Sequence, residues 1–155
     1  MKFLCDQMLG TLAKWLRLLG FDTFYASSDI SDDELLRIAE KEKRILITRD
    51  KQLIHRAEKN GLRVTKIETF DLTMQIRKVL QENNVQFNEN TILSRCSTCN
   101  AVLEKVSKEE VKDLVPERVF QQQDVFWRCP GCGKIYWLGS HYDNMKKTFQ
   151  KILLP

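Results

Sequence analysis

The 155-residue sequence lacks several features on which common classes of protein depend. No apolar run approaches the roughly 18 residues that a membrane-spanning helix needs. Asp6, Lys14 and Arg17 interrupt the apolar N-terminus, so it has no continuous apolar segment of the kind found in signal peptides. P-loop and dinucleotide-binding glycine motifs are absent, and the two histidines, His55 and His141, lie in unrelated segments. We therefore expect a cytoplasmic protein that does not contact a membrane and does not use a serine–histidine–acid site.

The composition is that of an ordinary globular protein. Hydrophobic residues make up 43% of the chain and charged residues 30%, which excludes a disordered or fibrous protein. The net charge of +4 is compatible with a polyanionic partner. A chain of this length, with no internal repeat and no low-complexity segment, is expected to form one domain, or one domain with a small appendix.

Short β-like runs alternate with amphipathic helical patterns in the first half of the chain. We expect strands at residues 2–5, 21–26, 44–48 and 62–67, and helices at 7–19, 31–43, 51–60 and 71–81. Ser31 and Glu34 have the spacing of a capping box at the start of the second helix. Strands that alternate with helices indicate βαβ units. The sequence therefore predicts an α/β fold with a mostly parallel sheet and helices on both of its faces.

A polar, asparagine-rich segment at residues 82–90 is the expected domain boundary. Residues 1–90 are expected to form the α/β domain. Residues 91–155 are expected to form a small ribbon of short strands with a helix that begins at Ser107. A final helix carries Met145, Phe149 and Ile152 on one apolar stripe.

Four of the five cysteines form two C-x-x-C pairs, Cys96/Cys99 and Cys129/Cys132. Each pair on a tight turn directs two thiolates to one point, and two pairs complete a tetrahedral site for structural zinc. Such a site has no open coordination position, so the metal would stabilise the fold and take no part in a reaction. The sequence therefore predicts a zinc ribbon in the C-terminal part.

Other features around the cysteines qualify this prediction. Gly131 and Gly133 suit the left-handed backbone of a zinc knuckle. The two pairs are separated by more residues than the usual 15–20 or so, so an elaborated loop or helix is expected between them. An iron–sulfur site and a thiol redox pair are the alternatives. The fifth cysteine, Cys5, is expected to be a small buried core residue.

Three aspartates lie between an expected strand and the helix that follows it, or at the start of that helix. Asp6 ends the first strand, Asp32 opens the helix after the second, and Asp50 follows the third. In a parallel sheet these positions share the edge at which α/β folds bind ligands. Converging carboxylates repel one another unless a cation neutralises them, and Mg²⁺ or Mn²⁺ prefers such oxygen ligands. A metal held there can activate a water for attack on a phosphodiester.

A simpler interpretation of these aspartates stays open. Aspartate is a preferred helix N-cap, and each of the three stands at the start of an expected helix. Glu68 and Asp71 lie just past the fourth strand, so either is a candidate fourth carboxylate, with Asp71 equally placed to cap its own helix.

Basic residues lie close to the predicted site. Lys14 and Arg17 occupy the polar face of the first helix, and Arg49 and Lys51 flank Asp50. These side chains would hold substrate phosphates as point charges or forks. For Lys14 and Arg17, a solvated helix face is an equally good interpretation.

The ordered segments FLCDQMLGTLAKWLRLLGFD, SDDELLRIA, RILITRD, RC-x-x-CN and CPGCGKIYWLGSH resemble the Mut-seven C-terminal RNase family. The resemblance covers nearly the whole chain. It implies a PIN-like nuclease domain over residues 1–90, a C-terminal zinc ribbon over 91–155, and metal-dependent hydrolysis of RNA that leaves a 5′-phosphate and a 3′-hydroxyl. It assigns the metal-binding acids to Asp6, Asp32 and Asp50, and it places Thr48 where PIN-like domains often carry a hydroxyl near the metal and substrate.

The predicted function is therefore a Mg²⁺- or Mn²⁺-dependent endoribonuclease with RNA as its partner, and a regulatory protein partner is compatible with the sequence. The first alternative is a non-catalytic RNA- or ribosome-binding protein. The second is a receiver-like phosphoryl-transfer domain, which needs an adjacent acidic pair after the first strand, whereas Asp6 is flanked by Cys5 and Gln7. The third is a thiol redox protein.

Overall fold

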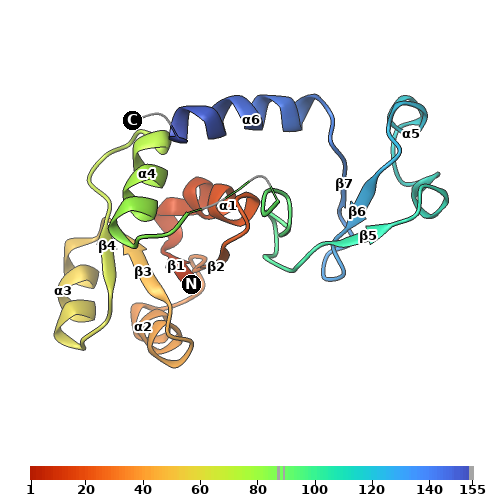
Figure 1. Ribbon diagram of the computed structural model, residues 1–155. Helices are drawn as coiled ribbons and strands as arrows, with labels where there is room; N and C mark the ends of the chain where they lie inside the picture. The colour runs from red at the N-terminus through yellow and green to blue at the C-terminus, as the bar shows by residue number, and fades with distance from the viewer. Residues whose placement is uncertain (87, 89, 154–155) are drawn as a thin grey trace.

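The computed structural model describes residues 1–86, 88 and 90–153. Residues 87 and 89 of the expected boundary segment, together with 154 and 155, lie outside the described residues. Strands and helices alternate along the first half of the chain, and a small β-ribbon and a long helix follow (Figure 1). The elements, in order, are β1 (Lys2–Cys5), η1 (Gln7–Leu9), α1 (Gly10–Leu18), β2 (Asp22–Tyr25), α2 (Asp32–Lys41), β3 (Ile45–Thr48), α3 (Lys51–Lys59), β4 (Val64–Lys66), α4 (Leu72–Glu82), β5 (Glu104–Val106), η2 (Glu109–Val111), α5 (Glu117–Gln122), β6 (Phe126–Arg128), β7 (Ile135–Tyr136) and α6 (Ser140–Leu153).

The four N-terminal strands form one parallel sheet in the order β2-β1-β3-β4. Strand β1 pairs with both β2 and β3, so that Phe3 lies opposite Thr23 on one side and Ile45 on the other. Each parallel crossover contains a helix, as parallel strands require. From β1 the chain continues to β2 on one side of the sheet, and from β3 it continues to β4 on the other side. The position between β1 and β3 is therefore the switch point at which open α/β sheets bind ligands.

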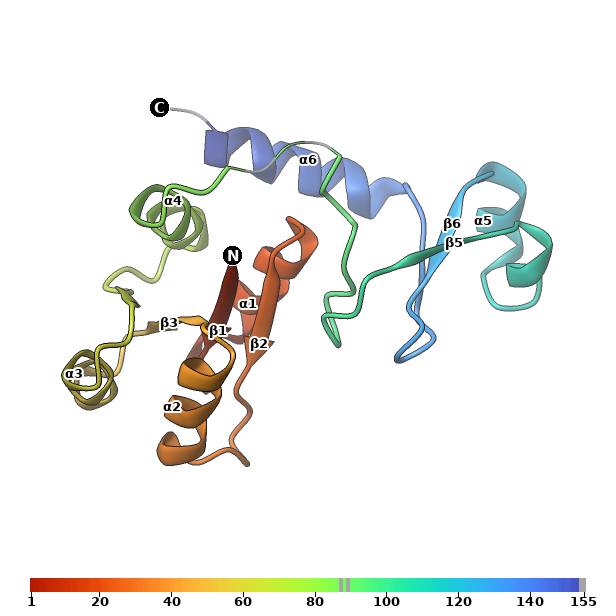
Figure 2. The same cartoon turned by 60° about the horizontal axis from the view of Figure 1, so that its bottom comes forward.

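The side chains of the sheet alternate between two apolar layers. Phe3, Cys5 and Ile45 point into the layer formed with α1 and α4, whereas Leu4 and Leu46 point into the layer formed with α2 and α3. The two helix pairs cover opposite faces of the sheet (Figure 2). Burial of each large apolar side chain contributes about 1.5–3 kcal/mol. The predicted α/β class, with a parallel sheet between helices, is confirmed.

Local capping chemistry sets where the helices begin and end. The hydroxyl of Ser31 accepts a hydrogen bond from the Glu34 N–H at the start of α2, as the capping-box spacing predicts. After α1 the chain turns at Gly20, whose φ of +98° suits glycine. A Cβ at this position would also come within 2.6 Å of the Thr91 carbonyl. Gly20 therefore permits both the turn and the close approach of the segment that leads to the ribbon.

The ribbon is a three-stranded antiparallel sheet in the order β5-β6-β7. The helix expected to begin at Ser107 is only the single turn η2, with no side-chain cap, and the short helix α5, which the sequence did not predict, follows it. Apart from Val111 these segments bury little, so few tertiary contacts extend the local helical preference into a longer helix.

The C-terminal helix α6 leaves the ribbon and lies against α4 and α1 (Figure 1). Its residues Phe149 and Ile152 are buried in the core of the parallel-sheet domain, where the ring of Phe149 meets Trp15 edge-on at 5.6 Å between centroids. The Arg77 guanidinium on α4 donates to the carbonyls of Ile152 and Lys151. The sequence grouped this helix with the ribbon, but Phe149 and Ile152 of its apolar stripe pack in the core beside the parallel sheet, while Met145 contacts both that core and the cysteine cluster. No helix of the described residues is both long and apolar enough to cross a bilayer.

Candidate functional site

Three elements bring Asp6, Asp32 and Asp50 to one cleft at the carboxyl edge of the parallel sheet. Asp6 follows β1 and Asp50 follows β3, on either side of the switch point, while Asp32 is the first residue of α2. All three line a cleft of about 90 Å³, together with the side chains of Met8 and Leu53 among others. The structure therefore places at one cleft the three acids that the sequence singled out.

A buried threonine connects two of these acids. Thr48 is fully buried, and its hydroxyl donates to Asp6 Oδ2 while its oxygen accepts from the Asp50 N–H at 3.1 Å. The other oxygen of Asp6 accepts from the Met8 N–H at 3.1 Å. Both oxygens of Asp6 are thus held in place. Thr48 has no exposed surface for substrate, so it positions the acids and does not have the substrate contact expected of it.

The environment of Asp6 disfavours its negative charge. Burial raises the pKa of Asp6, the hydrogen bonds from Thr48 and Met8 oppose this, and the charges of Asp50 and Asp32 raise it further. The carboxylates of Asp50 and Asp32 therefore repel that of Asp6 across the cleft. A bound cation relieves such repulsion.

Helix capping accounts for part of the acidic set. Asp50 Oδ1 accepts from the N–H groups of Gln52 and Leu53 and caps α3. Asp71 caps α4 in the same way, and neither it nor Glu68 lines the cleft. Asp32 does not cap α2, because Ser31 does. Within the described residues, the carboxylate of Asp32 and Oδ2 of Asp50 accept no hydrogen bond, so both remain available to a ligand.

The carboxylates are more widely spaced than the thiols of the ribbon. Among the described residues, only the cysteines bring ligand atoms from three or more His, Cys, Asp or Glu side chains all within 4.8 Å of one another. The three aspartates do not meet this spacing. Mg²⁺ commonly binds through one or two carboxylates and keeps several waters, so the donor set fits a hydrated cation better than one bound directly by all three.

The four ribbon cysteines form the tighter cluster. The sulfur atoms of Cys96 and Cys132 lie 3.6 Å apart and those of Cys99 and Cys129 lie 3.1 Å apart. Zinc–sulfur bonds of about 2.3 Å in a tetrahedron place sulfurs roughly 3.8 Å apart. Cys96 and Cys129 are buried and the other two are exposed. The thiols are therefore arranged as ligands of a single metal ion.

The two cysteine turns have the same backbone. In each, the residue after the second cysteine donates to the carbonyl of the first at 2.9 Å, from Asn100 to Cys96 and from Gly133 to Cys129. Both residues have left-handed backbones, with φ of +72° and +79°. Gly133 is thus left-handed as expected, whereas Gly131 is not among the residues with positive φ. In the first turn Asn100 takes this role, because asparagine tolerates this conformation best after glycine.

Hydrogen bonding favours the thiolate form of Cys96 within the cluster. Burial raises the pKa of Cys96, but donors outweigh it, chiefly the Tyr136 hydroxyl and the N–H groups of Cys99 and Thr98, and bring the pKa to about 6. Zinc binds the thiolate form of cysteine. The Tyr136 ring is buried and its hydroxyl contacts Ser97 as well. Tyr136 therefore belongs to the metal site, where it supports the thiolate.

Arg17 ties the first cysteine turn to the parallel-sheet domain. It is buried, and its guanidinium donates to the Thr23 carbonyl at 2.9 Å and to the carbonyls of Ser97 and Thr98, each at 3.1 Å. Its positive charge lies near the thiols, where it would offset the negative charge of four thiolates around a bound metal ion. Arg17 therefore has a structural role at this junction, and it lines the same groove as Lys14.

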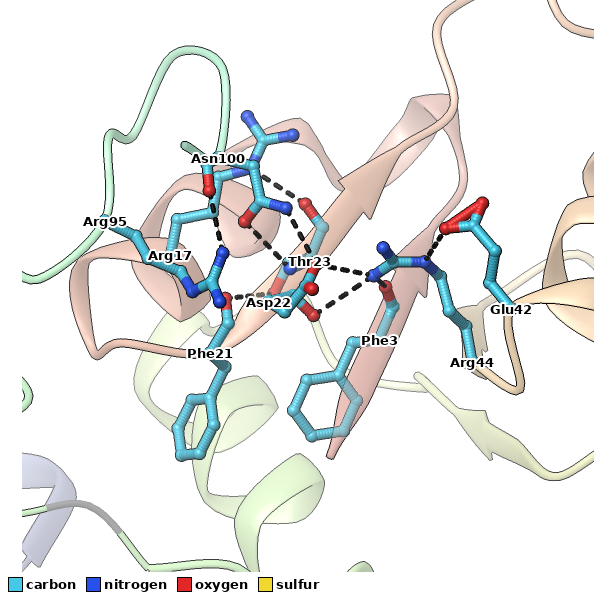
Figure 3. A network of polar contacts seen from close by, with 9 residues as sticks. All are labelled: Phe3, Arg17, Phe21, Asp22, Thr23, Glu42, Arg44, Arg95 and Asn100. Atoms are coloured by element: carbon cyan, nitrogen blue, oxygen red, sulfur yellow. Dashed lines mark hydrogen bonds and ion pairs between the residues drawn. The ribbon is translucent and has the colours of Figure 1, made fainter. Parts of the chain in front are cut away.

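Asn100 completes this junction (Figure 3). Its side chain accepts from the Thr23 N–H at 3.0 Å and donates to Asp22 Oδ1 at 2.8 Å. The same Asp22 oxygen pairs with the buried Arg44 at 2.8 Å. Because β2 is the outer strand of the sheet, Arg17 and Asn100 together satisfy backbone groups that would otherwise form an open edge.

The other candidate substrate contacts are accessible. Lys14 is exposed and lines a groove along α1 between Gly10 and the first cysteine turn. Arg49 is half-buried beside Asp50, donates to the Thr69 carbonyl at 2.7 Å, and stacks on the exposed ring of Phe70. No sequence pattern marked Phe70. Its only signal was a phenylalanine within the polar turn after the fourth strand.

Fold and site together define a class: a parallel α/β domain with an acidic cleft at its switch point and a four-cysteine ribbon. Residues 1–149 match the family described as the Mut7-C RNAse domain, and the chain belongs to this family. Membership indicates a nuclease-type function.

Two curated relatives show the range of similarity. The human protein named exonuclease mut-7 homolog is 31% identical over 118 residues, which cover 74% of this chain but 13% of that protein. The chain thus spans about an eighth of that relative's length. A rubredoxin from Nostoc sp. strain PCC 7120 is 39% identical over 46 residues, which cover 28% of this chain and 41% of the rubredoxin. No solved structure matches the chain.

Proposed function

We propose that the protein is a divalent-cation-dependent ribonuclease that cleaves RNA internally at the acidic cleft. The observation that carries this proposal is the meeting of Asp6, Asp32 and Asp50 at one cleft of the sheet, in a chain that belongs to an RNase family. RNA is the expected substrate because the family is described by RNase activity.

The chain's own residues have separable tasks in this proposal. Asp6 is held by Thr48 and Met8, so it is a rigid ligand at the base of the cleft. Asp32 and Asp50 line the same cleft and would complete the binding of Mg²⁺ or Mn²⁺. A bound cation would supply Lewis-acid polarisation of the phosphate and a more acidic water. Arg49 and Lys14 would hold the phosphates on either side.

The test compares single charge-removing variants on a single-stranded oligoribonucleotide. Asp6→Asn, Asp32→Asn and Asp50→Asn are each expected to lower the Mg²⁺- or Mn²⁺-dependent cleavage rate by more than about 100-fold, which exceeds the 10- to 100-fold typical for residues that only support a metal ligand. Asp33→Asn is the matched control, because Asp33 is exposed beside Asp32 and pairs with Arg56 outside the cleft.

One further substrate and one further condition sharpen the test. A circular RNA is expected to be cleaved, because an internal cut needs no free end. Chelation of the divalent cation is expected to stop cleavage. Parent-like cleavage by Asp32→Asn or Asp50→Asn would contradict the assignment of the cleft as the active site.

A non-catalytic RNA-binding protein is the second candidate, and the wide spacing of the three carboxylates favours it. It predicts salt-sensitive binding of RNA that persists without Mg²⁺, with no cleavage of any RNA. The same oligoribonucleotide therefore distinguishes the two functions.

The cysteine cluster is proposed to hold zinc as a structural ion. Four thiolates in a tetrahedron suit zinc or iron, and the two are told apart because a ferric tetrathiolate absorbs visible light whereas zinc does not. We expect a colourless protein with about one zinc per chain.

A further inference from the structure

Phe70 is a large apolar side chain with no packing role. It is 87% exposed, the highest value among the large hydrophobic side chains of the described residues. It lies in the turn between β4 and α4. That turn leaves the sheet beside Thr48, because the Ile67 N–H donates to the Thr48 carbonyl at 3.0 Å. Phe70 is therefore presented at the same sheet edge as the acidic cleft.

The turn that carries Phe70 is fixed on both sides. The Thr69 carbonyl accepts from Arg49 at 2.7 Å and from Gln75 at 2.8 Å. The Thr69 hydroxyl accepts from the Asp71 N–H at 3.1 Å, and Asp71 in turn caps α4. The exposure of Phe70 thus results from a held backbone and not from a loose loop.

Arg49 occupies one face of the Phe70 ring. Its guanidinium carbon lies 4.0 Å from the ring centroid, within the range of a cation–π contact. Its Nε atom is buried without a hydrogen-bond partner. No Asp or Glu within the described residues forms an ion pair with Arg49. The exposed ring of Phe70 and the guanidinium of Arg49, which has no ion-pair partner, therefore lie together. Arg49 directly precedes Asp50 in the sequence.

We propose that Phe70 stacks an unpaired base of the RNA strand while Arg49 contacts the adjoining phosphate, so that this pair holds the strand across the acidic cleft. The inference rests on the proposed function and specifies its substrate as single-stranded RNA. Aromatic rings stack on any base, and the positive charge follows the backbone, so the pair selects strand state more than base sequence. Bases inside a duplex are already stacked and unavailable.

This geometry also gives a reason for a phenylalanine in a turn where exposing a polar side chain to water would cost less free energy. One face is covered by Arg49, which orients the ring, and a base can approach the rest of the ring. A protein partner docking on Phe70 is the competing occupant. It is disfavoured by the uncompensated charge beside the ring, which matches a phosphate.

The test measures binding separately from cleavage. All variants carry Asp32→Asn to prevent cleavage, and fluorescence anisotropy with Mg²⁺ present follows a labelled eight-nucleotide single-stranded RNA of roughly the length that one such site covers. Phe70→Ala is expected to weaken binding by about 5- to 160-fold, the range of base–aromatic stacking. Phe70→Trp is expected to bind within about threefold of the parent and to show quenched tryptophan emission on binding.

Two controls make the result specific. Leu114→Ala removes an apolar side chain that is 60% exposed in the ribbon and should leave binding unchanged. Arg49→Gln is expected to reduce the slope of log affinity against log salt concentration by about 0.7, the value for one phosphate contact on a single strand, whereas Phe70→Ala leaves that slope unchanged.

The possible outcomes separate this inference from the proposed function. The stacking role is wrong if Phe70→Ala binds the RNA as tightly as the Asp32→Asn protein that keeps Phe70, or if that protein does not bind the RNA. In either case, cleavage of RNA by the unsubstituted protein would still support a ribonuclease. If Phe70-dependent binding is found but no cleavage occurs without the Asp32 substitution, the stacking role stands and the ribonuclease assignment is wrong.

Discussion

Asp50 has two roles in this structure, and a pair of substitutions separates them. Its Oδ1 atom caps α3 through the N–H groups of Gln52 and Leu53, at 2.9 and 3.1 Å, and the residue also lines the acidic cleft. Asp50→Asn keeps a side-chain oxygen at the cap and removes the charge, because asparagine caps as well as aspartate. Asp50→Ala removes both.

The expected effect on stability differs between the two substitutions. Loss of the cap in Asp50→Ala costs about 1 kcal/mol, or about 2–4 °C in Tm for a chain of this size. Asp50→Asn loses the attraction of the charge to the helix dipole, about 0.3–1 kcal/mol, but it also relieves repulsion with Asp6. We therefore expect Asp50→Asn to unfold within about 0.5 kcal/mol of the parent, although both variants lose cleavage.

Urea unfolding followed by circular dichroism measures the stability, and the oligoribonucleotide assay measures the activity. The expected pattern is two inactive proteins, of which only Asp50→Ala is less stable. If Asp50→Asn were as unstable as Asp50→Ala, the capping argument would be wrong. If either retained parent-like cleavage, capping would be the sole role of Asp50.

The remaining predictions concern the ribbon, the junction and α6. Chelation of zinc should lower the Tm and make the four ribbon thiols reactive toward a thiol reagent, while Cys5 stays protected because it is fully buried; reactive ribbon thiols before chelation would refute the metal site. Removal of the buried Arg44 by Arg44→Met should cost about 3 kcal/mol, because Asp22 loses its ion pair, and an unchanged urea midpoint would refute this. Although burial raises the pKa of Asp22, the hydrogen bonds of Asn100 and Arg44 lower it overall. Asp22 therefore stabilises the fold above its unfolded-state pKa near 4, and this stabilisation is lost as the pH falls through the lower folded-state value; Asp22→Asn should flatten that acid limb of the stability curve. Phe149→Ala should cost about 3–5 kcal/mol, because Phe149 anchors α6 on α1 and α4, and a loss below 1 kcal/mol would show that α6 does not stabilise the first domain.

Most of the parallel-sheet domain was predictable because its signals are local. Short apolar, β-branched runs mark strands, a 3.6-residue period marks helices, and Ser31 and Gly20 mark helix ends. The expected strand at 21–26 is Asp22–Tyr25 in the structure, a difference at the ends only. The prediction of a helix beginning at Ser107 was wrong, because a capping pattern without an apolar face to bury is not sufficient for a helix.

The acidic cleft was predictable only through topology. A one-dimensional pattern cannot distinguish a capping aspartate from a metal ligand, and Asp50 turned out to be a cap as well. Phe70 was not predicted because one exposed aromatic ring in a turn has no period or spacing. Its significance depends on the stacking of Arg49, which directly follows the neighbouring strand β3.

The order of residues along the chain was sufficient to specify the α/β class and the two cysteine turns, because each of these is encoded by neighbours a few positions apart. The burial of Arg17 and the packing partner of α6 are not encoded by sequence neighbours. The helical period places Arg17 on the same polar face as Lys14, yet the first cysteine turn docks on Arg17 and buries it. The apolar stripe of α6 could have met any hydrophobic surface, and packing in three dimensions directs it to the first domain, where α1 and α4 leave part of their core uncovered.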